Sequence, residues 1–188
     1  MPMPDGLRVI DTHVNIPWSQ HDDARYGAFR GLQRDRESLE NFKMPAQYMF
    51  RAIPDLGDDS STYVGRVLEA MDKHAVAVAL IPAADALTYP EIVRDHAERF
   101  IFQSAVDPNK GMDEIRRIRA LHAQLGLRGL SYFASGSMPQ VAINGKEMYP
   151  FYALACELEL PFFLNVGVPG PRIPLATQKV ELLDEICW

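Results

Sequence analysis

Residues 7–15 read Leu-Arg-Val-Ile-Asp-Thr-His-Val-Asn, and this stretch decides how the rest of the chain is interpreted. An apolar run comes first, and polar side chains then occupy every second position, namely Asp11, His13 and Asn15. A strand places alternate side chains on one face, so these three are predicted to project the same way. A strand that is polar at its carboxyl end is typical of the first strand of an α/β barrel, whose chemistry gathers at that rim. The alternative is a strand that runs into a polar loop, with His13 a hydrogen-bonded loop residue.

The composition is that of an ordinary globular protein and bounds its partners. The 188 residues predict a single domain, residues 1–188, with one sizeable core. The net charge of −6 argues against a sequence-independent grip on nucleic acid, which needs a basic face. No apolar run is long enough to span a bilayer, and the first residues lack the features of a signal peptide. We therefore expect a cytoplasmic protein that binds neither nucleic acid nor membrane.

A long connection, residues 16–60, follows the first strand. It is rich in polar and aromatic side chains, and a helix is expected around Arg36–Met44 before proline and glycine interrupt the pattern. A connection of this length usually builds part of a binding site or is mobile. The alternative is a solvated insertion.

From Ser61 onward, apolar strands alternate with amphipathic helices. Strands are predicted at residues 76–81, 100–106, 127–133 and 161–166, and helices around 64–71, 90–99, 115–125, 148–158 and from 180. This alternation indicates parallel βα units with right-handed crossovers. The five strands are fewer than the eight of a closed barrel, so by length an open doubly wound sheet fits better. However, no glycine-rich turn follows the first strand to hold a phosphate, which disfavours dinucleotide binding.

Several segments, taken in order, carry a family resemblance: residues 10–15, 71–81, 99–108, 126–130, 148–152 and 160–167. Together they resemble the amidohydrolase-related family, in the branch of aminocarboxymuconate-semialdehyde decarboxylase and related aromatic-acid decarboxylases. The family fold is a distorted barrel. The resemblance therefore implies an incomplete TIM-type (β/α) barrel of about five parallel strands, the amino-terminal portion of that barrel. It also implies a hydrolase or decarboxylase that acts on a small carboxylated or cyclic substrate.

The resemblance also implies a metal site, and the residues at the ligand positions predict that it is degenerate. In the family the first strand supplies a His-x-His pair to a divalent metal, usually zinc, and the fifth strand supplies another His. The matching residues here are His13, Asn15 and Asn165, and an amide oxygen is a poorer zinc donor than imidazole. Asp11, Asn15 and Asn165 are predicted to line the substrate pocket, and Arg172 to hold a substrate carboxylate. The alternative for Arg172 is a solvated loop arginine.

A second hypothesis keeps the fold without catalysis, as a metal-free binding or partner subunit or a truncated inactive fragment. Five strands leave two apolar edges open, which proteins normally cover or pair. We therefore expect a homo-oligomer or pairing with the missing half of a barrel. Residues 182–188 stop inside an apolar helical pattern, which favours an incomplete chain.

Two smaller groups of residues have plain interpretations. Cys156 and Cys187 each fall in a predicted helix beside apolar residues, where a buried free thiol is expected. Arg116, Arg117 and Arg119 form a basic cluster that we interpret as a solvated helix face.

Overall fold

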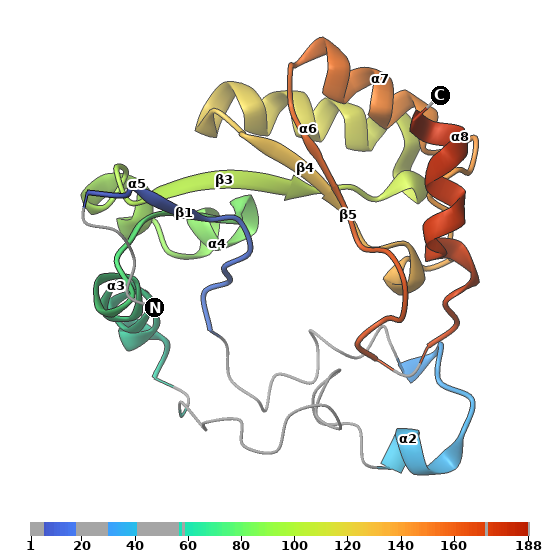
Figure 1. Cartoon of the computed structure of the whole chain (residues 1–188), viewed down its shortest axis with the longest axis horizontal. Coiled ribbons are helices and arrows are strands. Elements are labelled where there is room, and N and C mark those ends of the chain that lie inside the picture. The colour runs from blue at the N-terminus through green and yellow to red at the C-terminus, as the bar shows by residue number, and fades with distance from the viewer. Residues whose placement is uncertain (1–5, 18–29, 41–56, 58, 172, 188) are drawn as a thin grey trace.

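Five parallel strands form one curved sheet at the centre of the protein (Figure 1). The computed structural model describes residues 6–17, 30–40, 57, 59–171 and 173–187. The strands pair in chain order and are β1 (Val9–Asp11), β2 (Val76–Pro82), β3 (Phe100–Ala105), β4 (Gly129–Tyr132) and β5 (Phe162–Leu164). This arrangement confirms the predicted incomplete TIM-type barrel.

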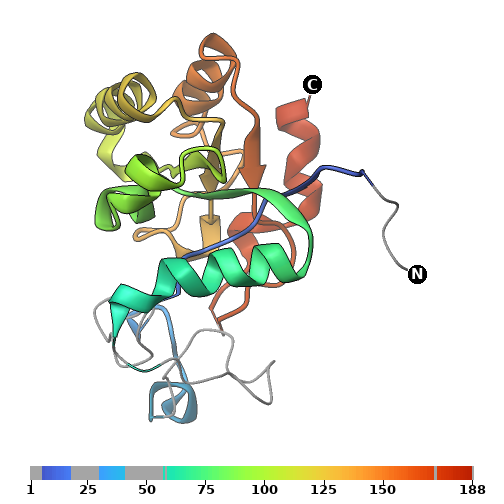
Figure 2. The same ribbon diagram turned by 90° about the vertical axis from the view of Figure 1, so that its left-hand side faces the viewer.

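Helices alternate with the strands along the chain, and all but α2 and α8 contribute residues to the core on the outer, convex side of the sheet. They are α2 (Arg36–Glu40), α3 (Tyr63–Lys73), α4 (Ala83–Thr88), α5 (Glu91–Asp95), α6 (Gly111–Leu125), α7 (Tyr149–Glu157) and α8 (Asp184–Cys187). Short 3-10 turns are η2 (Ser60–Thr62), η3 (Pro108–Lys110), η4 (Ala134–Gly136), η5 (Ala176–Gln178) and η6 (Val180–Leu183). Figure 2 shows α3 along the outside of the sheet, where it packs against β2. Helix α2 is the part of the predicted helix at Arg36–Met44 that lies within the described residues.

One helix prediction is wrong. Instead of a single helix over residues 90–99, the chain forms α4 directly after β2 and then the short α5. Pro90 disfavours helical backbone in the residue before it, and Tyr89 accordingly takes an extended conformation with φ −121° and ψ 81°. Helix α5 ends at His96, whose φ of −137° takes the chain out of the helix and towards β3.

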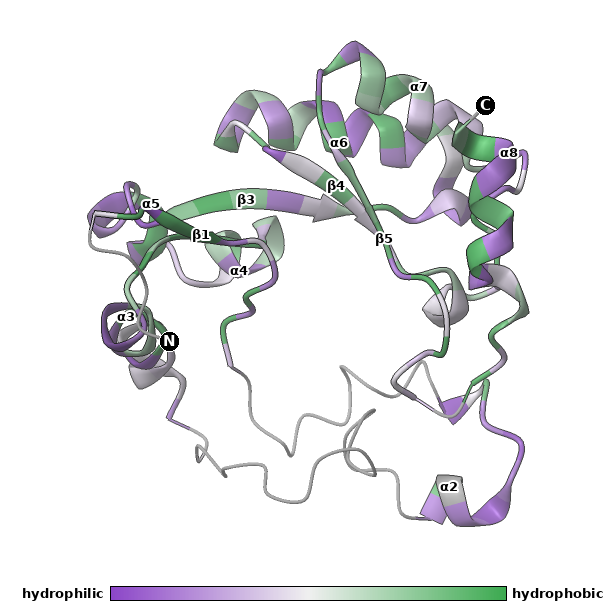
Figure 3. Ribbon diagram, in the orientation of Figure 1, coloured by the Kyte–Doolittle hydropathy of each residue, from purple (hydrophilic) through white to green (hydrophobic). Residues whose placement is uncertain are grey.

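The main apolar core lies between the sheet and the outer helices. Phe100, Phe102 and Leu130 project from the strands into this core and pack with Ile118 of α6 and Phe151 of α7. Figure 3 shows hydrophobic residues concentrated in the strands, while the helices combine hydrophilic and hydrophobic positions. Burial of one helix face against the strands is the main stabilising contribution in such a layer.

The other face of the sheet is concave and is defined by the strand register. Ser131 of β4 is level with Phe163 of β5, and Gln103 of β3 is level with Gly129 of β4. Because neighbouring strand positions point to opposite faces, these residues lie on the side away from the helices. Gly129 has no side chain, and the Phe163 ring takes the space, with a ring carbon 2.6 Å from where a Cβ would lie.

Both cysteines are free, but the prediction that they are buried is wrong, because Cys156 and Cys187 are exposed. Phe151, Leu154 and Ala155 are the residues of α7 that face the core. A helix turns by about 100° per residue, so the next residue, Cys156, points towards solvent.

The basic cluster on α6 is solvated as predicted, because Arg116, Arg117 and Arg119 are all exposed, and each of the three also has polar partners. Arg119 makes two hydrogen bonds of 2.6 Å to Glu157 of α7. Arg117 reaches the sheet, and Arg116 pairs with Asp113 on its own helix. The cluster therefore ties α6 to its neighbours. No helix in the described part of the chain is long and apolar enough to cross a membrane.

Candidate functional site at the carboxyl ends of the strands

The chain leaves β1 through a bend at Thr12. The Asp11 carboxylate accepts a hydrogen bond from the His13 amide at 3.0 Å. Asp11 is level with Ala79 of β2, and the Val14 amide donates to the Leu80 carbonyl at 3.2 Å. In a parallel pair, that bond places Val14 level with the residue after Leu80. From Asp11 to Val14 the first strand advances three residues, while β2 advances only two, from Ala79 to Ile81. The first strand therefore contains one extra residue here, which interrupts the alternation of its side chains between the two faces.

This extra residue determines which side chains face the concave side. Val14 and Ile16 both pack with the core under the helices. Their neighbours His13 and Asn15 therefore project to the opposite, concave face, where both are exposed. Asp11 is instead on the helix side of the sheet, like Ala79, the residue of β2 with which it is level. The predicted common direction thus holds for His13 and Asn15 and fails for Asp11, whose carboxylate holds the bend.

At the other edge of the sheet, Asn165 continues β5 by one residue. Its amide donates to the Tyr132 carbonyl at 3.1 Å, so the parallel pairing with β4 persists. Phe162 and Leu164 pack with buried residues on the helix side. Alternation then places Asn165 on the concave face, and its side chain is exposed.

The predicted site residues thus lie on one face but on two edge strands. Strands β1 and β5 are separated by three others. In a flat sheet, four spacings of roughly 4.8 Å would put the two edges about 19 Å apart. The curvature of the sheet shortens this span and turns both carboxyl ends towards the same interior (Figure 1). Arg172 lies outside the described residues.

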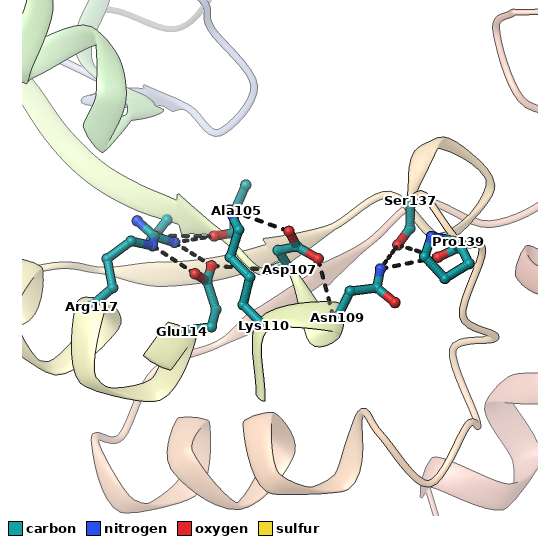
Figure 4. Close-up of polar contacts among 9 residues, drawn as sticks. Ala105, Asp107, Asn109, Lys110, Glu114, Arg117, Ser137 and Pro139 are labelled. Carbon is teal, nitrogen blue, oxygen red and sulfur yellow. Dashed lines mark hydrogen bonds and ion pairs between the residues drawn. The ribbon is translucent and has the colours of Figure 1, made fainter. Parts of the chain in front are cut away.

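An ion pair between a buried carboxylate and a half-exposed arginine fixes the carboxyl end of β3 (Figure 4). The Glu114 carboxylate accepts from the Asp107 amide at 3.1 Å and from Arg117 at 2.5 and 2.9 Å. Arg117 also donates to the Ala105 carbonyl at 2.7 Å and to the Ser104 hydroxyl at 3.0 Å. The hydrogen bonds that Arg117 donates to the Glu114 carboxylate raise the pKa of Arg117. The start of α6 is thereby fastened to the last residues of the strand.

Amide side chains then join the rim loops to one another. Asn109, after β3, donates to the Ser137 hydroxyl and the Pro139 carbonyl, both at 3.0 Å, in the loop after β4 (Figure 4). Gln178 of η5 accepts from the Ser135 amide at 3.1 Å and donates to the Gly167 carbonyl at 2.9 Å, which joins the loops after β4 and β5. Sequence reasoning missed these residues, because loop amides carry no periodicity and their partners are distant in the chain.

Two tyrosines brace the same region from the helix side. The Tyr132 hydroxyl donates to the Val141 carbonyl at 2.8 Å, and the Tyr152 hydroxyl to the Ile143 carbonyl at 2.6 Å. Burial raises the pKa of both phenols, because their charged forms lose hydration. The neutral, hydrogen-bonded phenols hold the segment between β4 and α7 in place.

The donor set on the concave face does not fit a zinc ion. Among the described residues, no group of three or more His, Cys, Asp or Glu side chains could hold a metal. His13 offers one imidazole, whereas Asn15 and Asn165 offer neutral amide oxygens. Catalytic zinc sites use three protein ligands, mostly imidazole or carboxylate, so these residues alone make a weak zinc site.

The five parallel strands define an incomplete barrel, and the comparisons give its family. The family model described as Amidohydrolase matches residues 10–187. The chain therefore belongs to the amidohydrolase family, which generally uses a divalent metal. The family resemblance read from the sequence is thereby confirmed.

A comparison with curated proteins finds no match. Among solved structures, the chain is similar to 2,6-dihydroxybenzoate decarboxylase from Rhizobium, with 13% identity and a TM-score of 0.48. That match covers 86% of this chain and 50% of the decarboxylase, so the chain spans about half the length of that protein.

Proposed function

We propose that the chain forms part of an amidohydrolase-type enzyme that hydrolyses or decarboxylates a small carboxylated or cyclic substrate at the concave rim. The proposal rests on the alternation of residues 13–16. Val14 and Ile16 pack with the core, so His13 and Asn15 face the concave side, where both are exposed. With Asn165 at the end of β5, three polar side chains then face the interior in which barrel enzymes bind their substrates.

The proposed roles follow from the chemistry of these side chains. Asn15 and Asn165 each offer an amide donor and acceptor that suit substrate oxygens. His13 supplies the imidazole, the side chain best suited to moving a proton near neutral pH. The substrate-binding roles of Asp11 and Arg172 stay predictions. A bound divalent metal would polarise a substrate carbonyl, but with two amides at the ligand positions we propose a degenerate, weakly binding metal site.

Metal analysis and activity screening of the purified full-length chain test this proposal. The panel contains amides, lactones and aromatic carboxylic acids. We expect turnover of one class, with a loss of at least about 100-fold in His13→Ala, because positioned proton transfer contributes about 10²- to 10⁴-fold. His74→Ala is the matched control, since His74 is exposed at the end of α3. No turnover of any class would reject catalysis.

A non-catalytic partner subunit is the second candidate, and the two open sheet edges favour it. Apolar side chains are exposed beside both edges: Leu7 and Ile10 at 57% and 52% near β1, and Val168 at 81% after β5. Exposed apolar edges are normally covered or paired. Sedimentation measurements discriminate here. This candidate predicts a homo-oligomer, or a complex with a second half-barrel, and a stable monomer at low micromolar concentration would contradict it.

A further inference from the structure

We infer that Asp85 and Gln178 are positioning residues that hold the two ends of the proposed site, Asp85 the segment at Asn15 and Gln178 the segment at Asn165. The inference rests on the proposed function, because it concerns the same concave rim. Neither side chain lies on the concave face itself. Each acts through a hydrogen bond to backbone just beyond a site residue.

Asp85 fixes the chain immediately after Asn15. It lies in the first turn of α4 and is 5% exposed. Its carboxylate accepts a hydrogen bond from the Ile16 amide at 3.1 Å, across 69 residues of sequence. Ile16 is itself 1% exposed, so this amide has left water and needs the acceptor. This hydrogen bond and the packing of Ile16 together set the direction in which the Asn15 side chain points.

Gln178 does the same after Asn165. Its side chain is 1% exposed, and both ends of its amide are bonded to backbone of the rim loops, at Ser135 and Gly167. The Gly167 backbone amide also donates to the backbone carbonyl of Gln178 at 2.8 Å, so two hydrogen bonds join these residues. Gly167 has a φ of +82°, a left-handed conformation that favours glycine. The turn that follows Asn165 is therefore held by the backbone carbonyl and the buried side chain of the same residue, Gln178.

These two anchors predict local effects, each confined to one end of the site. Asp85→Ala removes the acceptor, whereas Asp85→Asn keeps an oxygen in place for the Ile16 amide. Gln178→Met keeps the length and the apolar stem but removes both hydrogen-bonding atoms. Val67→Ala is the control for general destabilisation, because Val67 is a buried core residue of α3 with no part in the rim.

The experiment measures benzoate binding by NMR titration of the full-length chain, with benzoate as a small carboxylated ring. We expect the dissociation constant to rise at least about tenfold in Asp85→Ala and Gln178→Met, and to stay within about twofold of wild type in Asp85→Asn and Val67→Ala. The comparison is made between variants with similar melting temperatures. If Val67→Ala then raises the dissociation constant as much as Asp85→Ala and Gln178→Met do, the two anchors only stabilise the fold, and the inference is overturned.

The side-chain amide resonances give a second readout that does not need a ligand. Asp85→Ala is expected to shift the Asn15 amide and leave that of Asn165 unchanged, and Gln178→Met is expected to do the reverse. If wild type does not bind benzoate, the proposed substrate class fails, and these resonances alone decide the inference. Unshifted asparagine amides in both variants would overturn it.

Discussion

Arg117→Ala is predicted to be among the most destabilising single changes at the rim, because of an asymmetry in burial. The Glu114 carboxylate is 2% exposed, whereas the Arg117 side chain is 43% exposed. Removing the arginine leaves a buried carboxylate with one remaining donor among the described residues, the Asp107 amide. Breaking a buried pair in this way costs about 3–5 kcal/mol. Since Arg117 is partly screened by water, we expect the lower end, about 3 kcal/mol.

The reverse change is predicted to be milder. Glu114→Gln keeps an oxygen for the Asp107 amide, and the partly exposed Arg117 can turn to water. The expected loss is about 1.5–2 kcal/mol, the lower part of the range for hydrogen bonds to a charged group. Arg116→Ala is the control: its pair with Asp113 is exposed at 71% and 85%, and such surface pairs contribute less than about 1 kcal/mol.

Urea unfolding followed by circular dichroism at neutral pH measures these free energies, with equal slopes as the test for two-state behaviour. The predicted order of destabilisation is Arg117→Ala, then Glu114→Gln, then Arg116→Ala. A loss for Arg117→Ala no larger than that for Arg116→Ala would refute the reasoning from burial, as would a larger loss for Glu114→Gln.

Three further predictions concern other parts of the fold. Tyr152→Phe should lower the free energy of unfolding by about 1 kcal/mol at neutral pH through its lost hydrogen bond. Burial raises the pKa of Tyr152, so wild-type stability should fall as the pH rises above about 10, and unfolding midpoints should show a smaller fall in the variant. Gly129→Ala should lower the free energy of unfolding by about 1–3 kcal/mol, because a Cβ meets the Phe163 ring, and Phe163→Leu should relieve that loss in denaturant titrations. Cys156 and Cys187 should both react with a thiol reagent without denaturant, and a thiol that reacts only after unfolding would contradict their exposure.

The strand pattern could be predicted from the sequence because hydrophobic periodicity is a local signal. The continuous apolar run at residues 76–81 is a strand buried on both faces, and the structure places β2 at Val76–Pro82. The helix stripe of Ile115, Ile118 and Leu121 is the buried face of α6. In each of these segments, the order of apolar and polar residues alone predicts which side chains are buried.

Features that depend on contacts between distant segments could not be predicted in this way. The extra residue between Asp11 and Val14 is visible only against the register of β2, so strict alternation placed Asp11 on the wrong face. Ion pairs such as Arg119 with Glu157 form across two helices, and the sequence of the basic cluster predicts its exposure but not these partners. Likewise, an amide such as that of Gln178 shows its role only when its partners are folded around it.

The account depends on the two edges of the curved sheet facing one interior. Zinc affinity, measured by competition with a chelating indicator, tests this in Asn15→His, Asn165→His and the double variant, with the exposed Gln124→His of α6 as control. Together with His13, the double variant would offer three imidazoles. We predict that it binds zinc at least about tenfold more tightly than the product of the single effects, because only ligands of one ion couple in this way. A double variant that equals that product, or gains no more than the control, would contradict the shared interior.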